Sequence, residues 1–282
     1  MNTINTLIMP DHERLAIQDH TGSSGQALRG QVVLVHGLGE HMGRYAHVID
    51  RLNNWGFDVR SYDHYGHGKS SGHRGCLPSP NRLLDDLGMV IDATRKQMAQ
   101  SSVAQGTPLI LLGHSMGGLV AARFVSLNMR PVDALVLSSP ALGAKLSGFQ
   151  KFLLAVLPHI APNLAVANGL DARKISHDAA VVNAYLADPL VHNKISPRLG
   201  KFIFDNGAAT IAKAPEWRVP TLLMYAGQDK LVDPAASHMF TGLAPKSLVQ
   251  STCYQNLYHE IFNEVDSSAV FGELRDWLDG RF

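Results

Sequence analysis

Cysteine is scarce in this chain, which has only Cys76 and Cys253 among its 282 residues. The two are far apart and form no disulfide framework, so we expect a reducing compartment, the cytoplasm. Long hydrophobic runs are also missing, because no window approaches the roughly 18–20 apolar residues of a membrane-spanning helix. Residues 1–9 lack a basic start and a sustained apolar core, which argues against a signal peptide.

An excess of charge is missing too. The chain has 25 Lys and Arg against 24 Asp and Glu, a formal net charge of +1, so we expect no binding of nucleic acid through bulk electrostatics. Hydrophobic residues make up 45% and charged residues 17%, which allows a sizeable core in one domain, with or without an insertion. There is no internal repeat, and no feature indicates an oligomeric state.

Short apolar runs alternate with longer helical patterns, which predicts an α/β fold with a mostly parallel sheet flanked by helices. The predicted strands cover residues 15–18, 31–36, 57–63, 108–113, 134–138, 221–225 and 249–254. The predicted helices cover residues 45–55, 83–98, 116–128 and 269–278.

This alternation breaks between residues 140 and 215. There Pro158 and Pro162 interrupt the pattern after an apolar stretch at 149–157, and a helical pattern covers 197–206. We expect a helical cap inserted at 140–215, with residues 1–139 and 216–282 forming the core. The apolar stretch fits either a lid or membrane-seeking surface over a lipophilic site, or an amphipathic helix packed on the core.

Residues 113–117, Gly-His-Ser-Met-Gly, fit the nucleophile elbow, in which a serine occupies a sharp strand-to-helix turn. An apolar run leads into this motif and a helical pattern leads out of it, so Ser115 is the predicted nucleophile.

Residues 68–72 fit the same five-residue pattern, but polar residues precede them, and glycine and proline interrupt the segment after them. Ser70 is therefore rejected. A phosphate loop at this place also fails, because Asp63 stands where that pattern requires glycine.

A serine hydroxyl is a weak nucleophile at neutral pH and needs a general base beside it. In α/β-hydrolases the partners follow in the order Ser, Asp or Glu, His, each after a later strand. Asp229 follows the predicted strand 221–225, and His259 follows the predicted strand 249–254. We expect Asp229 to orient the imidazole and His259 to take and return the proton.

Two residues compete with this assignment. Asp233 precedes Pro234 and is more typical of a helix cap, and His238 falls on the helix expected after the Asp229 loop. Glu260 and Glu264 are expected to be structural partners near the histidine loop rather than catalytic acids.

The developing oxyanion needs two backbone donors. In this arrangement one is the amide after the nucleophile, here Met116, and the other comes from a loop after an earlier strand. The glycines of Gly37-Leu38-Gly39 let that loop turn inward, so Leu38 is the predicted second donor.

Histidines gather in sequence at His36, His41, His64, His67 and His73. None of the standard zinc-ligand spacings occurs among them, and the two groups lie on different loops. We therefore expect no metal and no other cofactor.

Four segments carry a family resemblance: residues 36–45, 63–72, 113–118 and 258–264. With these segments the chain resembles the monoacylglycerol lipase and lysophospholipase branch of the α/β-hydrolases. The resemblance implies the triad Ser115, Asp229 and His259, the donors Leu38 and Met116, and a helical cap after the strand at 134–138.

The resemblance also implies a serine ester hydrolase that cleaves a single-acyl lipid, above all monoacylglycerol to glycerol and free fatty acid. Members of the branch often meet membranes through the cap. The same-class alternatives are a lysophospholipase and a carboxylesterase for small esters. An acyltransferase shares the acyl-enzyme half of the mechanism, and a non-catalytic ligand receptor on the same fold is the alternative from another class.

Overall fold

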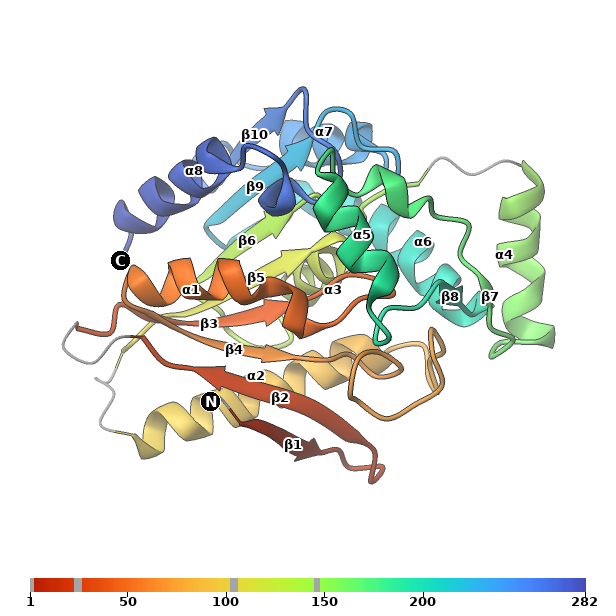
Figure 1. The fold of residues 1–282 in the computed structure, drawn as a ribbon, viewed down its shortest axis with the longest axis horizontal. Coiled ribbons are helices and arrows are strands. Elements are labelled where there is room, and N and C mark those ends of the chain that lie inside the picture. Colours follow the sequence, from red (N-terminus) through yellow and green to blue (C-terminus); the bar gives the residue numbers. More distant parts are fainter. Residues whose placement is uncertain (1–2, 23–26, 102–105, 145–147) are drawn as a thin grey trace.

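A twisted sheet of mixed direction forms the centre of the computed structural model, which describes residues 3–22, 27–101, 106–144 and 148–282 (Figure 1). Its spatial order is β1-β2-β4-β3-β5-β6-β9-β10, and the strands from β4 to β10 run parallel. β2 pairs antiparallel with β4, and β1 pairs antiparallel with β2. The strands are β1 (Ile4–Ile8), β2 (Arg14–His20), β3 (Gly30–Val35), β4 (Phe57–Tyr62), β5 (Leu109–His114), β6 (Ala134–Ser138), β9 (Thr221–Ala226) and β10 (Val249–Tyr254).

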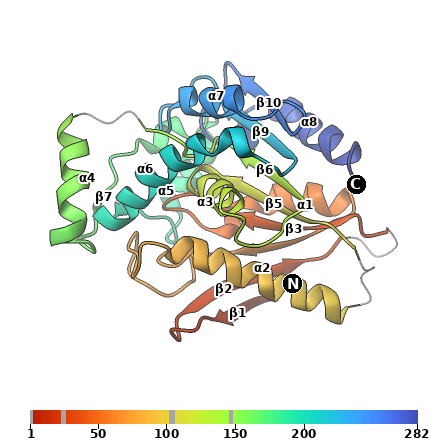
Figure 2. The same ribbon diagram turned by 180° about the vertical axis from the view of Figure 1, so that it is seen from behind.

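Helices cover both faces of this sheet (Figures 1 and 2). One face packs against α1 (Ala46–Asn54) and α8 (Ser268–Asp279), and the other against α2 (Arg82–Gln100), α3 (Ser115–Ser126) and α7 (Pro234–Leu243). The central strand β5 explains the continuous apolar run, because Leu109 and Leu111 join one core while Ile110 and Leu112 join the other. A strand buried on both faces needs apolar residues at every position.

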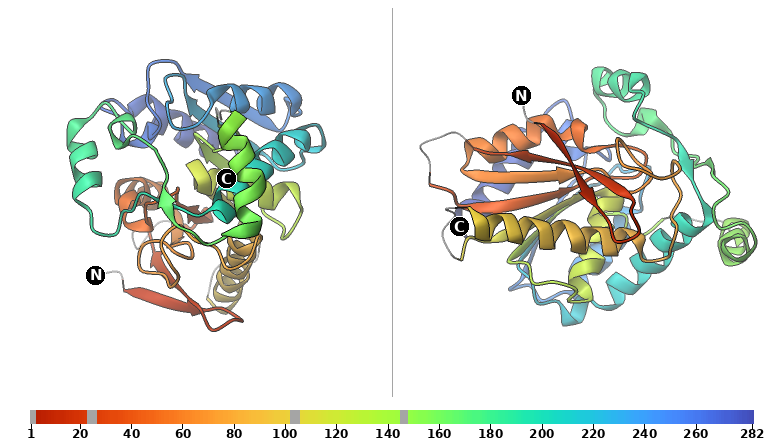
Figure 3. Two further views of the ribbon diagram at one scale, coloured as in Figure 1. Left: turned by 90° about the vertical axis from the view of Figure 1, so that its right-hand side faces the viewer. Right: turned by 90° about the horizontal axis from the view of Figure 1, so that it is seen from below.

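The segment between β6 and β9, here called the inserted segment, departs from the alternation of strands and helices. It contains α4 (Gly148–Ile160), β7 (Val166–Ala167), α5 (Ala179–Ala187), β8 (Lys194–Ile195) and α6 (Pro197–Ala212). Figure 3 shows it beyond the end of the sheet toward which the parallel strands run. Of its helices, α6 reaches the core through Leu199 and Phe202. Short 3-10 turns lie at Met42–Tyr45, Ala172–Lys174, Ala214–Glu216 and Ile261–Asn263.

The predicted fold class is confirmed, and each predicted strand and helix has a counterpart in the structure. The prediction was wrong where Pro158 was taken to interrupt the helical pattern, because α4 continues through Pro158 to Ile160. Proline removes one amide hydrogen bond, and here it does so in the last turn of the helix. β1, the two-residue strands β7 and β8, and α5 were not predicted. β1 is a short and mostly exposed edge strand, and α5 has no polar face to mark a helical period.

No helix in the described ranges combines the length and the apolar character that crossing a membrane requires.

Candidate active site

Ser115 occupies the turn where β5 ends and α3 begins. Its φ of +54° lies in the left-handed region, which a residue with a Cβ adopts only when its surroundings enforce it. The neighbouring glycines allow this turn to pack closely. A Cβ on Gly117 would lie 2.2 Å from the carbonyl oxygen of Val35 at the end of β3, and a Cβ on Gly113 would lie 2.6 Å from the Gly117 carbonyl oxygen. The helix can approach the sheet here only without those side chains.

His259 lies between Ser115 and Asp229. The Ser115 hydroxyl is 2.8 Å from His259 Nε2, and His259 Nδ1 is 2.6 Å from Asp229 Oδ2. The second Asp229 oxygen accepts hydrogen bonds from the amides of Leu231 and Val232 at 2.8 and 3.0 Å. These contacts fix the carboxylate, so Nδ1 carries the imidazole proton and Nε2 is the acceptor for the serine hydroxyl.

The electrostatics of this pair favour charge on both partners. Burial would lower the pKa of His259, but Asp229, by its charge and its hydrogen bond, together with Glu260 and Glu40, raises it above its ordinary value. Burial would raise the pKa of Asp229, but His259 and the two amides hold it below its ordinary value. His259 can therefore take a proton and keep a stabilising partner while it is charged.

A second histidine, His114, lies beside the first with ring centroids 4.8 Å apart. Burial, with a contribution from His259, lowers the pKa of His114 to about 4. Its Nδ1 lies 3.0 Å from the Ser138 hydroxyl. At neutral pH His114 is thus an uncharged neighbour, and it does not compete with His259 for the proton.

The two predicted oxyanion donors, Leu38 and Met116, border the same pocket as Ser115. Within the part of the chain that the structure describes, neither backbone amide donates to a loop carbonyl. The Met116 amide lies in the first turn of α3, where an amide has no intrahelical partner. Gly37, just before Leu38, packs so close to the nucleophile that a Cβ there would lie 3.1 Å from the Ser115 Cβ. Both N–H groups are therefore available to a ligand beside Ser115.

The competing residues have other environments. Asp233 caps α7, where its side chain accepts from the Ala235 amide, as expected of a helix cap. His238 is exposed on the same helix. Ser70 lies in the loop between β4 and α2; its hydroxyl donates to the Asp63 carbonyl at 2.5 Å and accepts from the Ala16 amide at 2.9 Å.

Glu260 and Glu264 both hold the histidine loop in place. Glu260 pairs with Arg44. Glu264 accepts from the Tyr258 amide at 2.6 Å and lies 2.9 Å from His177 Nδ1.

Three of the clustered histidines meet although they come from different loops. The His64 amide donates to His36 Nε2 at 3.0 Å, and His64 Nε2 lies 3.1 Å from the His36 carbonyl. The His67 ring lies 5.5 Å from that of His36. Burial lowers the pKa of each of these three rings, so they tie two loops together as neutral groups. No cluster of three or more His, Cys, Asp or Glu side chains within the described ranges is arranged to hold a metal ion.

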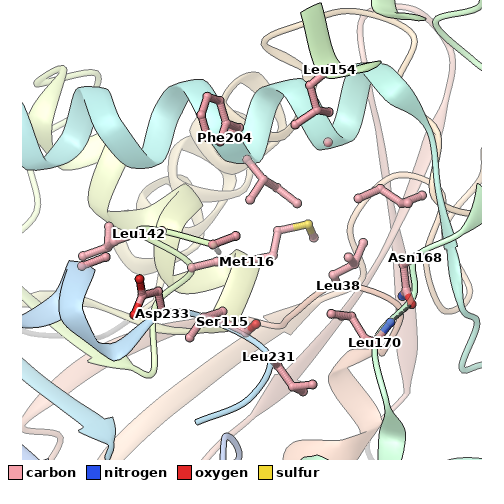
Figure 4. Close-up of a pocket in the computed structure, with 18 of the residues that line it drawn as sticks. Leu38, Ser115, Met116, Leu142, Leu154, Asn168, Leu170, Phe204, Leu231 and Asp233 are labelled. Carbon is pink, nitrogen blue, oxygen red and sulfur yellow. Dashed lines mark hydrogen bonds between the residues drawn. The ribbon is translucent and has the colours of Figure 1, made fainter. Parts of the chain in front are cut away.

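Two pockets meet at Ser115. The first, of about 520 Å³, is lined almost entirely by apolar side chains. Met116 and Leu38 lie near Ser115, whereas Leu154 of α4 and Phe204 of α6 lie on the opposite side of the pocket (Figure 4). Its other apolar lining residues include Leu142, Leu153, Leu157, Val166, Leu170, Ile203, Ile211, Leu231, Val232 and Met239. Such a pocket suits a hydrocarbon chain.

The second pocket, of about 640 Å³, is more polar and shares Ser115 and Leu38 with the first. Its lining has four carboxylates and one guanidinium: Glu40, Asp171, Asp188, Glu260 and Arg173. Arg173 is paired with Asp171 at 2.9 Å, and Asp188 lies 2.8 Å from His41 Nε2. The pocket therefore offers hydrogen-bonding groups but no unpaired guanidinium or ammonium group, among the residues that the structure describes, for a phosphate.

Sequence reasoning missed the polar lining of the second pocket, in particular Tyr185, Asp188 and Asn168. All three belong to the inserted segment, and no local pattern marks them. It also gave Arg44 no role beyond the family resemblance. The one local signal was the spacing of Glu40 and Arg44, four residues apart, at which opposite charges pair in helical turns.

Comparisons with known proteins identify the family and the relatives of this chain. A model of the Hydrolase_4 family, described as serine aminopeptidase, S33, matches residues 26–266. A monoacylglycerol lipase of Mycolicibacterium smegmatis is 34% identical over 89% of this chain and 88% of its own length. The crystal structure of the monoacylglycerol lipase of Paleococcus ferrophilus superposes with a TM-score of 0.83 at 33% identity, covering 94% of this chain and 98% of that one.

An uncharacterized abhydrolase domain-containing protein of Dictyostelium discoideum is 32% identical over 99% of this chain. The chain spans 29% of the length of that relative.

Proposed function

The chain belongs to the Hydrolase_4 family of serine hydrolases, and on this premise we propose that it hydrolyses single-acyl lipids, above all monoacylglycerol to glycerol and a free fatty acid. The observation that carries the proposal is the meeting of an apolar and a polar pocket at Ser115. An ester with its carbonyl at Ser115 would place a hydrocarbon chain in the apolar pocket and a polar alcohol in the other. A monoacylglycerol is a molecule of this shape.

Ser115 attacks the ester carbonyl while His259 Nε2 takes its proton. The amides of Leu38 and Met116 hold the oxyanion, and Asp229 stabilises the imidazolium. The proton then passes to the departing glycerol oxygen, which leaves an acyl group on Ser115. Water, deprotonated by His259, attacks the acyl carbonyl, and His259 returns this proton to the Ser115 oxygen as the bond to the acyl group breaks and the fatty acid leaves. Apart from the ester and the water, these steps use only side chains and amides of this chain.

The charge of the polar pocket supports a neutral alcohol over a phosphodiester. Its lining has a surplus of carboxylates, and its one guanidinium is paired, so a phosphate would meet repulsion there. This favours glycerol over the head group of a lysophospholipid.

The family description raises a second candidate, an aminopeptidase. The surplus of carboxylates in the polar pocket is the feature that would favour the α-ammonium group of a peptide. The apolar pocket argues against it, because the peptide beyond the cleaved bond would have to lie there with its polar backbone unpaired.

A substrate panel tests these proposals. We expect kcat/KM to be highest for monoacylglycerols of medium or long chain, and to rise up to roughly fourfold per added methylene while the pocket fills, since each buried methylene contributes about 0.8 kcal/mol. Acetyl and butyryl glycerol are the short-chain controls, lysophosphatidylcholine the phosphodiester control and a leucine anilide the peptidase control. Preference for any of these four control compounds contradicts the proposal.

A fluorophosphonate probe tests the nucleophile separately. The wild-type protein should be labelled, and Ser115→Ala should not, while Ser70→Ala should be labelled as the wild type is. A folded wild-type protein that is not labelled would favour a non-catalytic receptor.

The inserted segment is proposed to act as a cap that meets a lipid surface. Half of the exposed large apolar side chains in the described part of the chain lie on it: Ile160, Leu164, Val166, Leu170, Leu186 and Phe204. Val166, Leu170 and Phe204 also line the apolar pocket, so the apolar surface is continuous from pocket to solvent. Such a surface favours peripheral contact with a membrane.

Sedimentation with phosphatidylcholine vesicles tests this contact. The double variant Ile160→Ser, Leu164→Ser should bind less than the wild type. Val265→Ser is the matched control, because Val265 and Ile160 are both 74% exposed and Val265 lies outside the segment. Equal binding by all three proteins would remove the membrane contact from the proposal.

A further inference from the structure

A buried ionic bridge joins the loop of Leu38 to the loop of His259. Its centre is Arg44, whose Nη1 donates to Glu40 Oε2 and to Glu260 Oε1, each at 2.6 Å, and whose Nη2 donates to Glu260 Oε2 at 2.8 Å. The side chains of Arg44, Glu40 and Glu260 are 10%, 4% and 6% exposed. The bridge thus spans two loops that come after different strands, β3 and β10.

Each end of the bridge touches a group beside the reacting atoms. Glu40 Oε1 accepts from the Gly37 amide at 2.6 Å, one residue before Leu38, and from the Tyr45 hydroxyl at 2.6 Å. At the other end Glu260 directly follows His259 in the chain, and its own amide donates to the Ile175 carbonyl at 2.8 Å. A displacement of Arg44 would therefore move both the loop of Leu38 and the loop of His259.

Stability alone is a poor reason for such a bridge. Burying each charged group costs several kcal/mol, and apolar residues of similar volume often stabilise a fold as well or better. What an ionic bridge adds is a defined distance and angle, because a guanidinium binds a carboxylate with two parallel hydrogen bonds. This bridge also holds two carboxylates against one guanidinium, a surplus of one negative charge.

We propose that Glu40, Arg44 and Glu260 form a positioning bridge that fixes the Leu38 loop relative to the His259 imidazole, and whose surplus negative charge favours the imidazolium formed during turnover. This inference rests on the proposed function. The bridge residues are positioning residues, since they act through Gly37 and His259 rather than on the substrate.

The charges around His259 agree with this role. Burial alone would lower the pKa of His259, but the pKa is raised overall. Asp229 raises it most, followed by Glu260 and Glu40. His114, on the other side of the imidazole, has its pKa lowered to about 4 and is neutral. The bridge carboxylates therefore join Asp229 in stabilising the charged imidazole.

The variant Glu260→Gln tests the proposal, because it keeps size and one acceptor but removes the charge. On a soluble ester we expect kcat to fall roughly 10- to 100-fold, the range for a small misplacement of catalytic groups. KM should stay within about twofold of the wild type. In the pH dependence of kcat/KM, the acid limb should move to lower pH, because the pKa of His259 falls when the negative charge of Glu260 is removed.

Glu273→Gln is the matched control. Glu273 lies on α8 and accepts from the hydroxyls of Tyr254 and Thr252, each at 2.6 Å, so its substitution also disturbs two side-chain contacts, but contacts that include neither the imidazole nor the bridge. It should leave kcat and the pH profile unchanged.

The variant Arg44→Lys separates the effect of geometry from the effect of charge. It keeps the charge but loses the paired hydrogen bonds, so kcat should fall while the acid limb stays in place.

The rate of fluorophosphonate labelling at Ser115 gives a readout that needs no lipid, and thermal unfolding reports folding. Wild-type kcat and an unmoved acid limb in folded Glu260→Gln would overturn the bridge proposal alone. So would a loss of kcat with no shift of the acid limb, which is the pattern of a merely structural role. If Glu260→Gln does not fold, Glu40→Gln takes its place with the same expectations. A wild-type protein that is neither labelled nor active on esters would overturn the proposed function and the bridge with it.

Discussion

The loops at the carboxyl edge of the sheet and the inserted helices that face them are built in opposite ways. The side chains of His114, Asp229, His259 and Glu260 beside Ser115 are at most 7% exposed. Hydrogen bonds of 2.8 and 2.6 Å join Ser115 to His259 and His259 to Asp229. The inserted α5, by contrast, has no buried residue, and the segment exposes Ile160 and Leu186 to 74% and 63%.

This difference separates two tasks. Bond cleavage requires groups held within a few tenths of an ångström, which a close-packed edge of a sheet supplies. Binding a hydrocarbon chain requires an apolar surface of suitable volume, and partly buried helices can supply it without a fixed contact pattern. We therefore expect changes at the sheet edge to affect every substrate, and changes in the inserted segment to affect substrates according to their chain.

The largest effect is expected at the imidazole. His259→Ala should lower kcat by roughly 10⁴-fold or more on any ester, because triad members act as a unit. His238→Ala, on the exposed face of α7, is the control and should stay within about twofold of the wild type. Steady-state rates on a soluble ester, with thermal unfolding to report folding, make the measurement. Near-normal turnover in His259→Ala would refute the assignment.

A smaller effect, on stability, is expected at the elbow. Gly117→Ala places a methyl group 2.2 Å from the Val35 carbonyl oxygen and should reduce the free energy of unfolding by about 2–3 kcal/mol or more. Gly148→Ala, at the start of α4, meets nothing within 4 Å and should leave stability within about 1 kcal/mol of the wild type. Urea unfolding compares the two. Equal destabilisation would mean that the two regions are packed alike.

The next effect is a loss of activity on long-chain substrates, and it is expected from changes in the inserted segment. The double variant Leu154→Gln, Leu157→Gln puts polar groups into the apolar pocket. It should lower kcat/KM about tenfold for a dispersed long-chain acylglycerol, in line with losing one or two buried leucine side chains, and leave a soluble butyrate ester nearly unchanged. Leu127→Gln, after α3, is the control. Equal losses on both substrates would indicate that these leucines are core and not lid.

The smallest effect concerns pH. His259 must be neutral to accept the serine proton, so activity is lost as the pH falls through its pKa, which Asp229 raises above the ordinary value against the opposing effect of burial. The acid limb should therefore lie above pH 6.5, the ordinary histidine value. Glu40→Gln should move this limb to lower pH. Asp188→Asn, in the inserted segment, should not; an equal shift would show that both regions set the charge of the imidazole.

Sequence reasoning reached the fold through local patterns. The run at 109–112 is apolar at every position because both faces of β5 are covered, and the elbow glycines stand within two residues of Ser115. The chain order of Ser115, Asp229 and His259 limited the search for partners, and the structure brings these three within hydrogen-bond distance. Their catalytic roles remain predictions for the variants above. Patterns were weaker for α5, whose apolar residues show no helical period.

What the sequence by itself determined is therefore the α/β architecture and a short set of candidate residues, because strand burial, the strand-to-helix turn and the order of motifs are all properties of neighbouring residues. Only the tertiary structure decided which distant side chains meet. Arg44 and Glu260 are 216 residues apart in the chain, and the polar pocket combines loops after β3, β5, β9 and β10 with the inserted segment. Such contacts depend on how whole elements pack, and no local period or spacing encodes that packing.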